Sequence, residues 1–437
     1  SAIVLHMSEL GIKISEDSNL LDGDSGLLIT GAETGSEVRI SLSMTDSEGT
    51  EWRSENTYVA DGDGVVDTHR MAPQHGSYND VDPNGPYWSM TPDGRTTPVA
   101  FTPTIEDLAY QIQVATDTAH ADITVTRGYL AEVTSREVYG QGFHATIYTP
   151  RESNGAAVLV VPGTTGRAAS APTAALLASH GYHTMVVAYA IEEGLPPVVE
   201  EIPVEVLVTA LDVLLGDSHT EAKNASMIGY SVGTEGVLAA LAYTDLRIGS
   251  AIVVSPSSCI WQATGTGGRP PKSGSWTLAG KPLTWLKMKS ERLLSQLALN
   301  ATIGRVLPRK SPLSALDLIK SYGPAIADDA AYEAAAIAVE DISCPLLMLA
   351  SKDDHMWPSV EMVNRMTQRR EKAGRASADV YKTFEGAGHF LRPPVMPTTI
   401  PWTSDWIIGG QPKETAQAYV QAWADIEDFL LHTIRPT

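Results

Sequence analysis

Residues 228–238 have the sequence Ile-Gly-Tyr-Ser-Val-Gly-Thr-Glu-Gly-Val-Leu, a Gly-x-Ser-x-Gly pattern centred on Ser231. A serine at a sharp turn from strand to helix is held in a strained conformation that exposes its hydroxyl, and flanking glycines leave room for such a turn. The turn also leaves the backbone N–H of Val232 free to bind an oxyanion, at a helix N-terminus that adds positive potential. Because five residues are weak evidence, the surrounding sequence must decide whether this is a nucleophile elbow.

Strands and helices are predicted to alternate around Ser231. The continuous apolar runs Ala156–Val161 and Pro345–Ala350 are typical of strands buried on both faces. Further strands are predicted at Thr184–Ala188, Ala225–Ile228, Ala251–Val254 and Val380–Phe384, and helices at Ala168–His180, Val204–Leu215, Thr234–Tyr243, Val360–Ala373 and Thr415–His432. This alternation predicts an α/β-hydrolase fold, a mostly parallel sheet with helices on both faces and Ser231 between a strand and a helix.

The N-terminal part of the chain is predicted to form a separate all-β domain, at residues 8–122. Short runs with alternating apolar and polar residues are separated by turn residues, and no convincing helix interrupts them, which favours an antiparallel, immunoglobulin-like sandwich. These runs are Val38–Met44, Thr50–Val59, Val65–Thr68 and Leu108–Ala115. A hairpin over 129–138 and 142–148 then opens the catalytic domain, which is predicted at 123–437. Residues 1–7 have the character of an expression scar.

A Gly-, Pro- and Ser-rich segment interrupts the alternation and begins a predicted insertion, or lid, at about 262–336. Nine basic residues and one acid lie between Gln262 and Lys310, although the whole chain has a net charge of −21. The acidic balance argues against nucleic acid as a partner. The basic segment is either a site for an anionic ligand or a solvated surface that pairs with acids elsewhere.

Other features limit the cellular setting. Cys259 and Cys344 are too few for a disulfide framework and are predicted to be small buried hydrophobes. The longest apolar runs are too short for a membrane span, and no signal peptide pattern opens the chain. We therefore expect a cytoplasmic protein that does not bind membranes. No metal site is predicted, and the oligomeric state does not follow from the sequence.

The remaining catalytic groups are expected in loops that follow late strands. A serine hydroxyl needs a base to take its proton, and the base needs a carboxylate that fixes its tautomer. In α/β-hydrolases the chain order is serine, then acid, then histidine. Ser231, Asp354 and His389 have this order, and all three are predicted at the same edge of the sheet.

Alternatives exist for the base, for the acid and for the second oxyanion donor. His355 also follows a strand, but its adjacency to Asp354 makes it hard for both side chains to share one proton path. Asp353 is harder to separate from Asp354, because either can cap the following turn; Asp354 is favoured. The second oxyanion donor is expected in the loop after an early strand, at Thr164 N–H or, next, at Gly163. That loop lacks the phosphate-binding Gly-x-x-x-x-Gly-Lys pattern, so nucleotide hydrolysis is not supported.

Longer motifs are spread over most of the chain. They are Gly76-Ser-Tyr-Asn-Asp-Val-Asp-Pro-Asn-Gly-Pro-Tyr-Trp-Ser-Met90, Leu177-Ala-Ser-His-Gly-Tyr182, Ile228-Gly-Tyr-Ser-Val-Gly233, Lys352-Asp-Asp-His-Met-Trp357 and Gly388-His-Phe-Leu-Arg-Pro-Pro394. In these motifs the chain resembles the acyl-CoA thioesterase and bile acid-CoA:amino acid N-acyltransferase family. Members of that family join an N-terminal immunoglobulin-like domain to an α/β-hydrolase domain. The resemblance places the nucleophile, acid and base on Ser231, Asp354 and His389.

The chain departs from the family pattern at informative positions. The amino-acid-conjugating members carry a cysteine nucleophile, so Ser231 implies that water, rather than an amine, releases the acyl group. The segment after Pro162-Gly163 is shorter than the glycine-rich loop of eukaryotic members. Arg392 stands where those members carry an acid, which implies a different pocket specificity.

The resemblance implies a serine acyl-CoA thioesterase whose small-molecule substrate is an acyl-CoA ester. It implies no cofactor, since coenzyme A enters only as part of the substrate. The basic segment is then expected to bind the phosphate groups of coenzyme A, because Lys and Arg side chains bind phosphate. The alternatives are an acyltransferase that uses an amine or alcohol acceptor, an esterase on a specialised metabolite, and a binding or assembly module built on the β domain.

Overall fold

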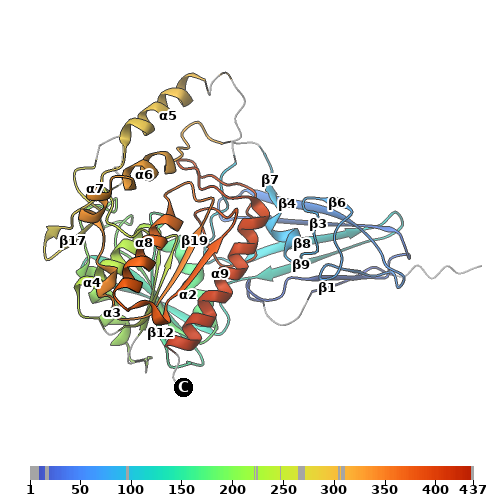
Figure 1. The fold of residues 1–437 in the computed structure, drawn as a ribbon. Coiled ribbons are helices and arrows are strands. Elements are labelled where there is room, and N and C mark those ends of the chain that lie inside the picture. The colour runs from blue at the N-terminus through green and yellow to red at the C-terminus, as the bar shows by residue number, and fades with distance from the viewer. Residues whose placement is uncertain are drawn as a thin grey trace, which may run out of the picture. The chain divides into compact units, whose positions relative to one another are not determined.

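The computed structural model describes residues 9–14, 19–94, 98–220, 222, 225–246, 248–263, 271–303, 306 and 311–434 (Figure 1). The predicted expression scar at 1–7 lies outside these residues. The chain divides into two compact units. The first unit comprises Ser1–Phe101, Glu106–Tyr129 and Pro393–Ile400, and the second comprises Thr102–Ile105, Leu130–Arg392 and Pro401–Thr437. Within the described residues, no helix has the length and apolar character needed to cross a membrane.

The first unit is built from antiparallel strands in two sheets. The larger sheet has the order β6-β4-β3-β8-β9, with β7 paired to β4, and the smaller has the order β1-β2-β5. The strands are β1 (Gly11–Ile14), β2 (Leu27–Thr30), β3 (Glu37–Thr45), β4 (Glu51–Val59), β5 (Val66–Asp67), β6 (His75–Gly76), β7 (Thr91–Pro92), β8 (Leu108–Ala115) and β9 (His120–Arg127), and one short helix, α1, spans Gly85–Trp88. The predicted antiparallel β region is confirmed, whereas its immunoglobulin-like topology stays a prediction.

Alternating burial explains why the strands of the larger sheet were predictable. Side chains of β3 and β8 alternate between buried and exposed, as in a sheet with one covered face. The predicted boundary at 122/123 falls inside β9, which pairs along its whole length with β8. Residues of β9 alternate between exposed and partly buried, so the alternation of apolar and polar residues is weaker there.

A late segment of the chain also belongs to the first unit, which differs from the predicted catalytic domain at 123–437. Residues 393–400 are grouped with the β strands. Thr398 N–H donates a 3.1 Å hydrogen bond to the Trp88 carbonyl, and Thr399 Oγ1 donates one of 2.6 Å to the Met90 carbonyl. Contacts between residues about 310 positions apart leave no periodic pattern that a sequence could reveal.

The second unit contains an eight-stranded sheet of order β10-β11-β13-β12-β15-β16-β19-β20. The strands are β10 (Val133–Gly140), β11 (Phe143–Pro150), β12 (Ala157–Val161), β13 (His183–Ala188), β15 (Ala225–Tyr230), β16 (Ile248–Val254), β19 (Leu346–Ser351) and β20 (Val380–Phe384). The pairings β10–β11 and β11–β13 are antiparallel, and all the others are parallel. The side chains of β12 and β19 are buried throughout, which confirms that these continuous apolar runs are strands covered on both faces.

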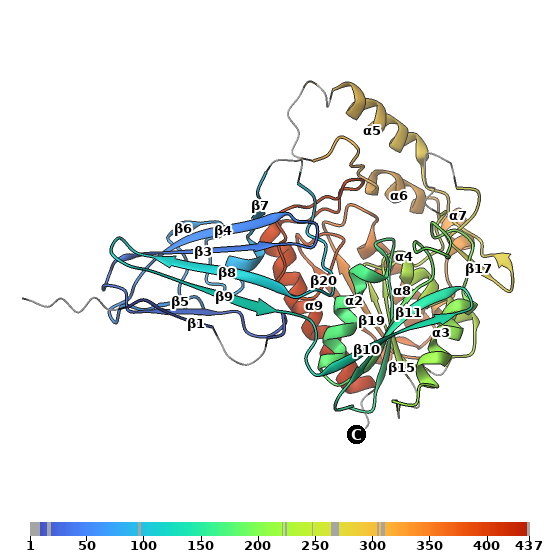
Figure 2. The same ribbon diagram turned by 180° about the vertical axis from the view of Figure 1, so that it is seen from behind.

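Helices cover both faces of this sheet, as predicted. In Figures 1 and 2, α2 and α9 lie on one face, and α3, α4 and α8 lie on the other. The helices are α2 (Gly166–Ser179), α3 (Glu205–Leu215), α4 (Val232–Tyr243), α8 (Ser359–Lys372) and α9 (Pro412–Thr433). Each parallel strand ends at the same edge of the sheet, so the loops that follow β12, β15, β19 and β20 meet there.

The predicted insertion lies between β16 and β19. It holds the short strands β17 (Trp276–Leu278) and β18 (Lys281–Pro282) and the helices α5 (Ser290–Thr302), α6 (Ile319–Ile326) and α7 (Asp329–Ala335). Strand β17 pairs in parallel with β14 (Ile202–Pro203), which precedes α3. In Figure 1 this segment lies beyond the carboxyl edge of the sheet, where a cover over the site is expected.

Candidate active site

Ser231 lies at the turn between β15 and α4. Its backbone has φ 51° and ψ −125°, a conformation that costs a non-glycine residue on the order of 1–3 kcal/mol. Ser231 N–H donates a 3.0 Å hydrogen bond to the Val254 carbonyl at the end of β16, and the Ser231 carbonyl accepts one of 2.9 Å from Thr234 N–H. The surrounding structure therefore holds the strained turn that a nucleophile elbow requires.

Glycines make room for this turn. A Cβ atom on Gly233 would lie 2.4 Å from the Pro162 carbonyl oxygen, and one on Gly163 would lie 2.9 Å from Ser231 Cβ. Both separations are too short for non-bonded atoms. The glycines therefore let the loop after β12 approach the serine directly.

His389 contacts Ser231 and Asp354 with its two ring nitrogens. Nε2 is 2.9 Å from Ser231 Oγ, and Nδ1 is 2.9 Å from Asp354 Oδ2. The backbone of His389 is fixed at both ends, because its N–H donates to the Ile408 carbonyl at 2.8 Å and its carbonyl accepts from Ser255 Oγ at 2.5 Å. The structure thus brings together the three residues that the sequence placed in one site.

The two neighbouring aspartates have different partners. Asp354 presents Oδ2 to the histidine, while its Oδ1 accepts hydrogen bonds from Met356 N–H at 2.8 Å and Trp357 N–H at 3.2 Å. Asp353 instead accepts a 3.0 Å hydrogen bond from Gly410 N–H. The geometry therefore favours Asp354 as the acid, and it caps the following turn as well.

His355 faces the insertion. Its Nδ1 is 2.9 Å from Asp317 Oδ1, its Nε2 is 3.3 Å from Asp353 Oδ1, and its carbonyl accepts a 2.8 Å hydrogen bond from Ile319 N–H. The hydrogen bond with Asp317 raises the pKa of His355 above its ordinary value. Burial acts to raise the pKa of Asp317, but hydrogen bonds from His355 and Lys320 outweigh it and hold that pKa low. Both ring nitrogens are thus engaged away from Ser231.

The expected oxyanion donors lie beside the serine. Val232 is the first residue of α4, where a backbone N–H has no intrahelical acceptor. Thr164 lines the same pocket as Ser231, and Gly163 lies against the serine. The choice between Thr164 and Gly163 as the second donor stays a prediction.

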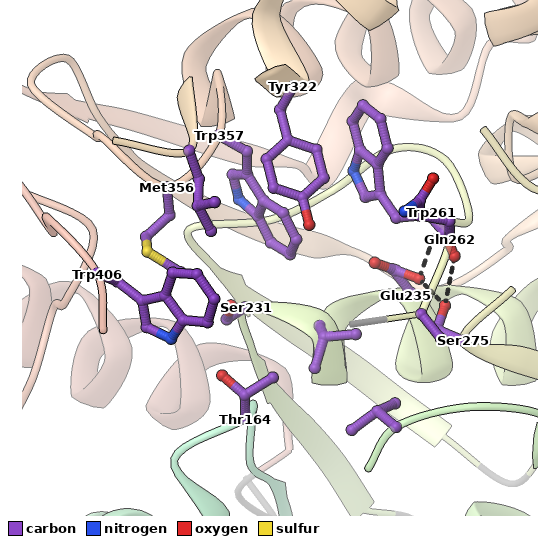
Figure 3. Close-up of a pocket in the computed structure, with 14 residues that line it drawn as sticks. Thr164, Ser231, Glu235, Trp261, Gln262, Ser275, Tyr322, Met356, Trp357 and Trp406 are labelled. Atoms are coloured by element: carbon purple, nitrogen blue, oxygen red, sulfur yellow. Dashed lines mark hydrogen bonds between the residues drawn. The ribbon is translucent and has the colours of Figure 1, made fainter. Parts of the chain in front are cut away.

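A largely apolar pocket, with several aromatic side chains in its walls, opens beside Ser231 (Figure 3). It is lined by Thr164, Val199, Ser231, Val232, Glu235, Trp261, Gln262, Ala263, Ser275, Leu318, Tyr322, Met356, Trp357 and Trp406. Ring centroids are 4.5 Å apart for Trp261 and Tyr322, 5.8 Å for Tyr322 and Trp357, and 5.6 Å for Trp357 and His389. This edge-to-face series connects the histidine to the far wall and forms an apolar surface for an acyl group.

The basic segment is only partly described. Arg269, Arg305, Arg309 and Lys310 lie outside the described residues. The described members, Lys272, Lys281, Lys287, Lys289 and Arg292, are exposed, and none of these five lines the pocket. The chain near Lys287 nevertheless lies against a pocket wall, because Gln262 N–H donates a 2.9 Å hydrogen bond to the Leu286 carbonyl.

Sequence reasoning missed one ionisable group in the pocket. Glu235 is fully buried, and its Oε2 accepts hydrogen bonds from Trp261 N–H at 3.2 Å and from Ser275 Oγ. Burial raises the pKa of Glu235 to about 8, although these two hydrogen bonds act to lower it. The sequence held one signal, since Glu235 follows Ser231 by four residues and so lies on the same side of the helix.

Glu235→Gln is expected to change how stability depends on pH. Below about pH 4.5, the ordinary pKa, Glu235 is protonated in both the folded and the unfolded chain. Between that value and about 8 only the unfolded chain releases the proton, so the free energy of unfolding falls as pH rises, by at most about 1.4 kcal/mol per pH unit from this group. Glutamine removes this contribution. The free energy of unfolding should be measured in urea at pH 5 and at pH 8. Between these values wild type should lose more stability than Glu235→Gln. If the two proteins show the same pH dependence, the raised pKa of Glu235 is contradicted.

The strand order, the strained turn and the Ser–His–Asp arrangement define an α/β hydrolase. Two family models match the chain: "Acyl-CoA thioester hydrolase/BAAT N-terminal region" over residues 24–139 and "BAAT / Acyl-CoA thioester hydrolase C terminal" over residues 314–436. The chain belongs to the acyl-CoA thioesterase/BAAT family, which confirms the resemblance of its motifs.

Curated relatives match over nearly the whole chain. Acyl-coenzyme A thioesterase 1 of Homo sapiens is 25% identical over 405 residues, which cover 90% of this chain and 89% of the relative. Acyl-coenzyme A thioesterase 2, mitochondrial, of Homo sapiens is 25% identical over 409 residues, which cover 90% of this chain and 77% of the relative. Acyl-coenzyme A thioesterase 1 of Mus musculus is 23% identical over 422 residues, covering 93% of each chain. Since one of these names specifies mitochondria, the cytoplasmic location of this protein stays a prediction.

Proposed function

We propose that the protein is a serine hydrolase that cleaves acyl-CoA thioesters to a free acid and coenzyme A. The observation that carries this proposal is the continuous contact from Ser231 Oγ through His389 to Asp354, beside an apolar pocket. Membership of the thioesterase family and the names of its relatives support the thioester as the bond that is attacked.

The first half of the reaction forms an acyl-serine. His389 Nε2 accepts the hydroxyl proton as Ser231 Oγ bonds to the thioester carbonyl carbon. The N–H of Val232 and a donor near Thr164 bind the resulting oxyanion. The carbon–sulfur bond then breaks, and the thiol of coenzyme A departs with the proton that His389 held. Asp354 keeps Nδ1–H of His389 oriented and stabilises the charged ring.

Water completes the reaction. His389 accepts a proton from water as the hydroxide bonds to the acyl carbon, and the proton returns to Ser231 Oγ when the acid leaves. A serine ester is less activated toward amines than a cysteine thioester, so Ser231 favours hydrolysis over transfer. Transfer to an amine or alcohol, or cleavage of an oxygen ester, is the competing outcome.

A substrate panel tests this function. Thiol release should be measured with acyl-CoA esters from short to long and branched, alongside oxygen esters of the same acids, with and without amine acceptors. We expect acyl-CoA hydrolysis to be the efficient reaction and to be unaffected by the amines. Cleavage of the oxygen esters without any acyl-CoA hydrolysis would overturn the substrate class.

The double variant K287E/K289E is expected to weaken binding of acyl-CoA. Lys287 and Lys289 are exposed, on a segment that lies against the pocket wall, and coenzyme A carries several phosphate charges. Reversal of two exposed charges should raise KM for acyl-CoA roughly 2- to 10-fold, with less effect at high salt. KM for a neutral ester of the same acid should not change.

A matched variant controls for net charge. K13E/K372E makes the same change at exposed lysines outside the basic segment, so its KM for acyl-CoA should stay near the wild-type value. Equal effects of K287E/K289E on the thioester and the neutral ester would show that the segment does not bind the phosphates.

A further inference from the structure

Glu235 is a buried acid in the pocket wall that the proposed reaction does not use. It lies on α4 four residues after Ser231, has no exposed surface, and lines the pocket. Four residues of helix rise by about 6 Å. The carboxyl group therefore lies within reach of the part of an acyl group that adjoins the thioester.

The two oxygens of Glu235 have different surroundings. Oε2 accepts the hydrogen bonds from Trp261 N–H and Ser275 Oγ, whereas buried Oε1 has no hydrogen-bond partner among the described residues. In Figure 3 the dashed lines join one side of the carboxyl to Ser275 and Trp261, and the other oxygen is directed toward the space between Ser231 and Tyr322. An unsatisfied buried polar atom is costly, so a partner supplied by a ligand is the natural complement.

The proton of a neutral Glu235 is expected on Oε1, because Oε2 already accepts two hydrogen bonds. A protonated carboxylic acid then donates from Oε1 into the pocket. The indole Nε1 of Trp261, a donor in the same wall, is likewise buried without a partner among the described residues. The hydroxyl of Tyr322 adds a third group that can donate. A wall with these donors suits an oxygen atom that accepts hydrogen bonds.

We propose that Glu235 determines specificity by donating a hydrogen bond to an oxygen atom carried by the acyl group. The substrates would be coenzyme A thioesters of short oxygenated acids, with a hydroxyl or keto oxygen near the thioester, in preference to plain aliphatic ones. This inference rests on the proposed thioester hydrolysis and adds the class of acyl group. Pockets built to hydrogen-bond a substrate discriminate against analogues that lack the polar group, because the buried groups are then left unpaired.

Two isosteric pairs of substrates test the proposal. 3-Hydroxybutanoyl-CoA is compared with 3-methylbutanoyl-CoA, and 4-oxopentanoyl-CoA with 4-methylpentanoyl-CoA, so that an oxygen replaces a methyl group in each pair. We expect wild type to prefer the oxygenated member of at least one pair about tenfold in kcat/KM at pH 7. If all four esters are cleaved and neither pair shows a preference, the inference is wrong and thioester hydrolysis stands. If none of the four is cleaved while other acyl-CoA esters of the substrate panel are, the inference is again wrong and thioester hydrolysis stands. If no acyl-CoA ester of that panel is cleaved, the proposed function fails instead.

Two variants of Glu235 separate recognition from a purely structural role. Glu235→Gln keeps an oxygen for Trp261 N–H and Ser275 and an N–H donor for the pocket, so it should retain the preference. Glu235→Met keeps the length of the side chain but has no hydrogen-bond donor, so it should lose the preference. The ratio of kcat/KM for the oxygenated ester to kcat/KM for its methyl analogue should then lie within about twofold of one. Because each ratio is measured on one protein preparation, partial misfolding cancels. Equal losses on both members of each pair in Glu235→Met would mean that Glu235 only supports the fold.

The pH dependence provides a second readout. The titratable groups around Glu235 are Tyr189, Cys259 and Tyr322, and burial raises the pKa of each, so all three stay neutral when Glu235 ionises at about pH 8. Ionised Glu235 cannot donate to a ketone. The wild-type preference for 4-oxopentanoyl-CoA should therefore fall between pH 7 and pH 9, whereas that of Glu235→Gln should not. A pH effect on the chemical step that both substrates of a pair share divides out of the ratio. A wild-type preference that is constant across this range would overturn the assignment of the donor.

Discussion

Ser231→Ala is expected to lower kcat for acyl-CoA hydrolysis by about 10⁴-fold or more, the loss seen when other serine hydrolases lose their nucleophile. In the proposed mechanism Ser231 Oγ is the atom that bonds to the acyl carbon, and in the structure it lies 2.9 Å from His389 Nε2. Alanine removes that atom and leaves the pocket and the oxyanion donors in place. Thiol release with saturating substrate measures the effect.

Two controls distinguish loss of the nucleophile from loss of the fold. The variant should unfold thermally within a few degrees of wild type, because the side chain fills little space and the backbone hydrogen bonds of Ser231 do not depend on it. A fluorophosphonate probe should label wild type at Ser231 and fail to label the variant. Wild-type turnover in Ser231→Ala would falsify the proposed mechanism.

Asp354→Asn is expected to lower kcat by a similar factor, for a reason that the hydrogen bonds make specific. Met356 N–H and Trp357 N–H both donate to Oδ1, so the amide oxygen of asparagine takes that place and its NH₂ group faces His389. The imidazole must then accept at Nδ1 and carry its proton on Nε2, where it cannot take the serine proton. The equivalent change in a trypsin-type triad costs about 10⁴-fold in kcat.

Asp353→Asn is the matched control, since it makes the same change one residue away. Asp353 contacts Gly410 N–H and His355, and asparagine can keep the first of these contacts. We expect kcat to fall less than about tenfold. Comparable losses in the two variants would show that the acid has not been separated from its neighbour.

The sequence predicted the sheet and helices of the second unit well because their signals are local or periodic. Burial on both faces gives β12 and β19 continuous apolar runs, and the Gly-x-Ser-x-Gly pattern records the space needed at Gly229 and Gly233. The order of Ser231, Asp354 and His389 follows from the topology of the parallel sheet. Both cysteines are free and buried, as composition suggested.

Other features depend on contacts that no local pattern records. Asp353 and Asp354 are adjacent, so only the direction of the loop after β19 decides which one reaches His389. Residues 393–400 join the β unit through hydrogen bonds to carbonyls about 310 positions earlier. The pKa of Glu235 depends on its complete burial in the folded chain, which residues 228–238 alone could not indicate.

The hydrogen bonds between the insertion and His355 limit how this enzyme can diversify. Asp317 and Ile319 bind His355, which follows Asp354 directly, while Leu318 and Tyr322 from the same segment form part of the pocket wall. The segment between β16 and β19 is therefore not an exchangeable module. A chimera that received this segment from a relative would acquire a new pocket but lose the anchoring of the loop that carries the acid. Substrate range and catalytic rate are thus expected to evolve together in this lineage.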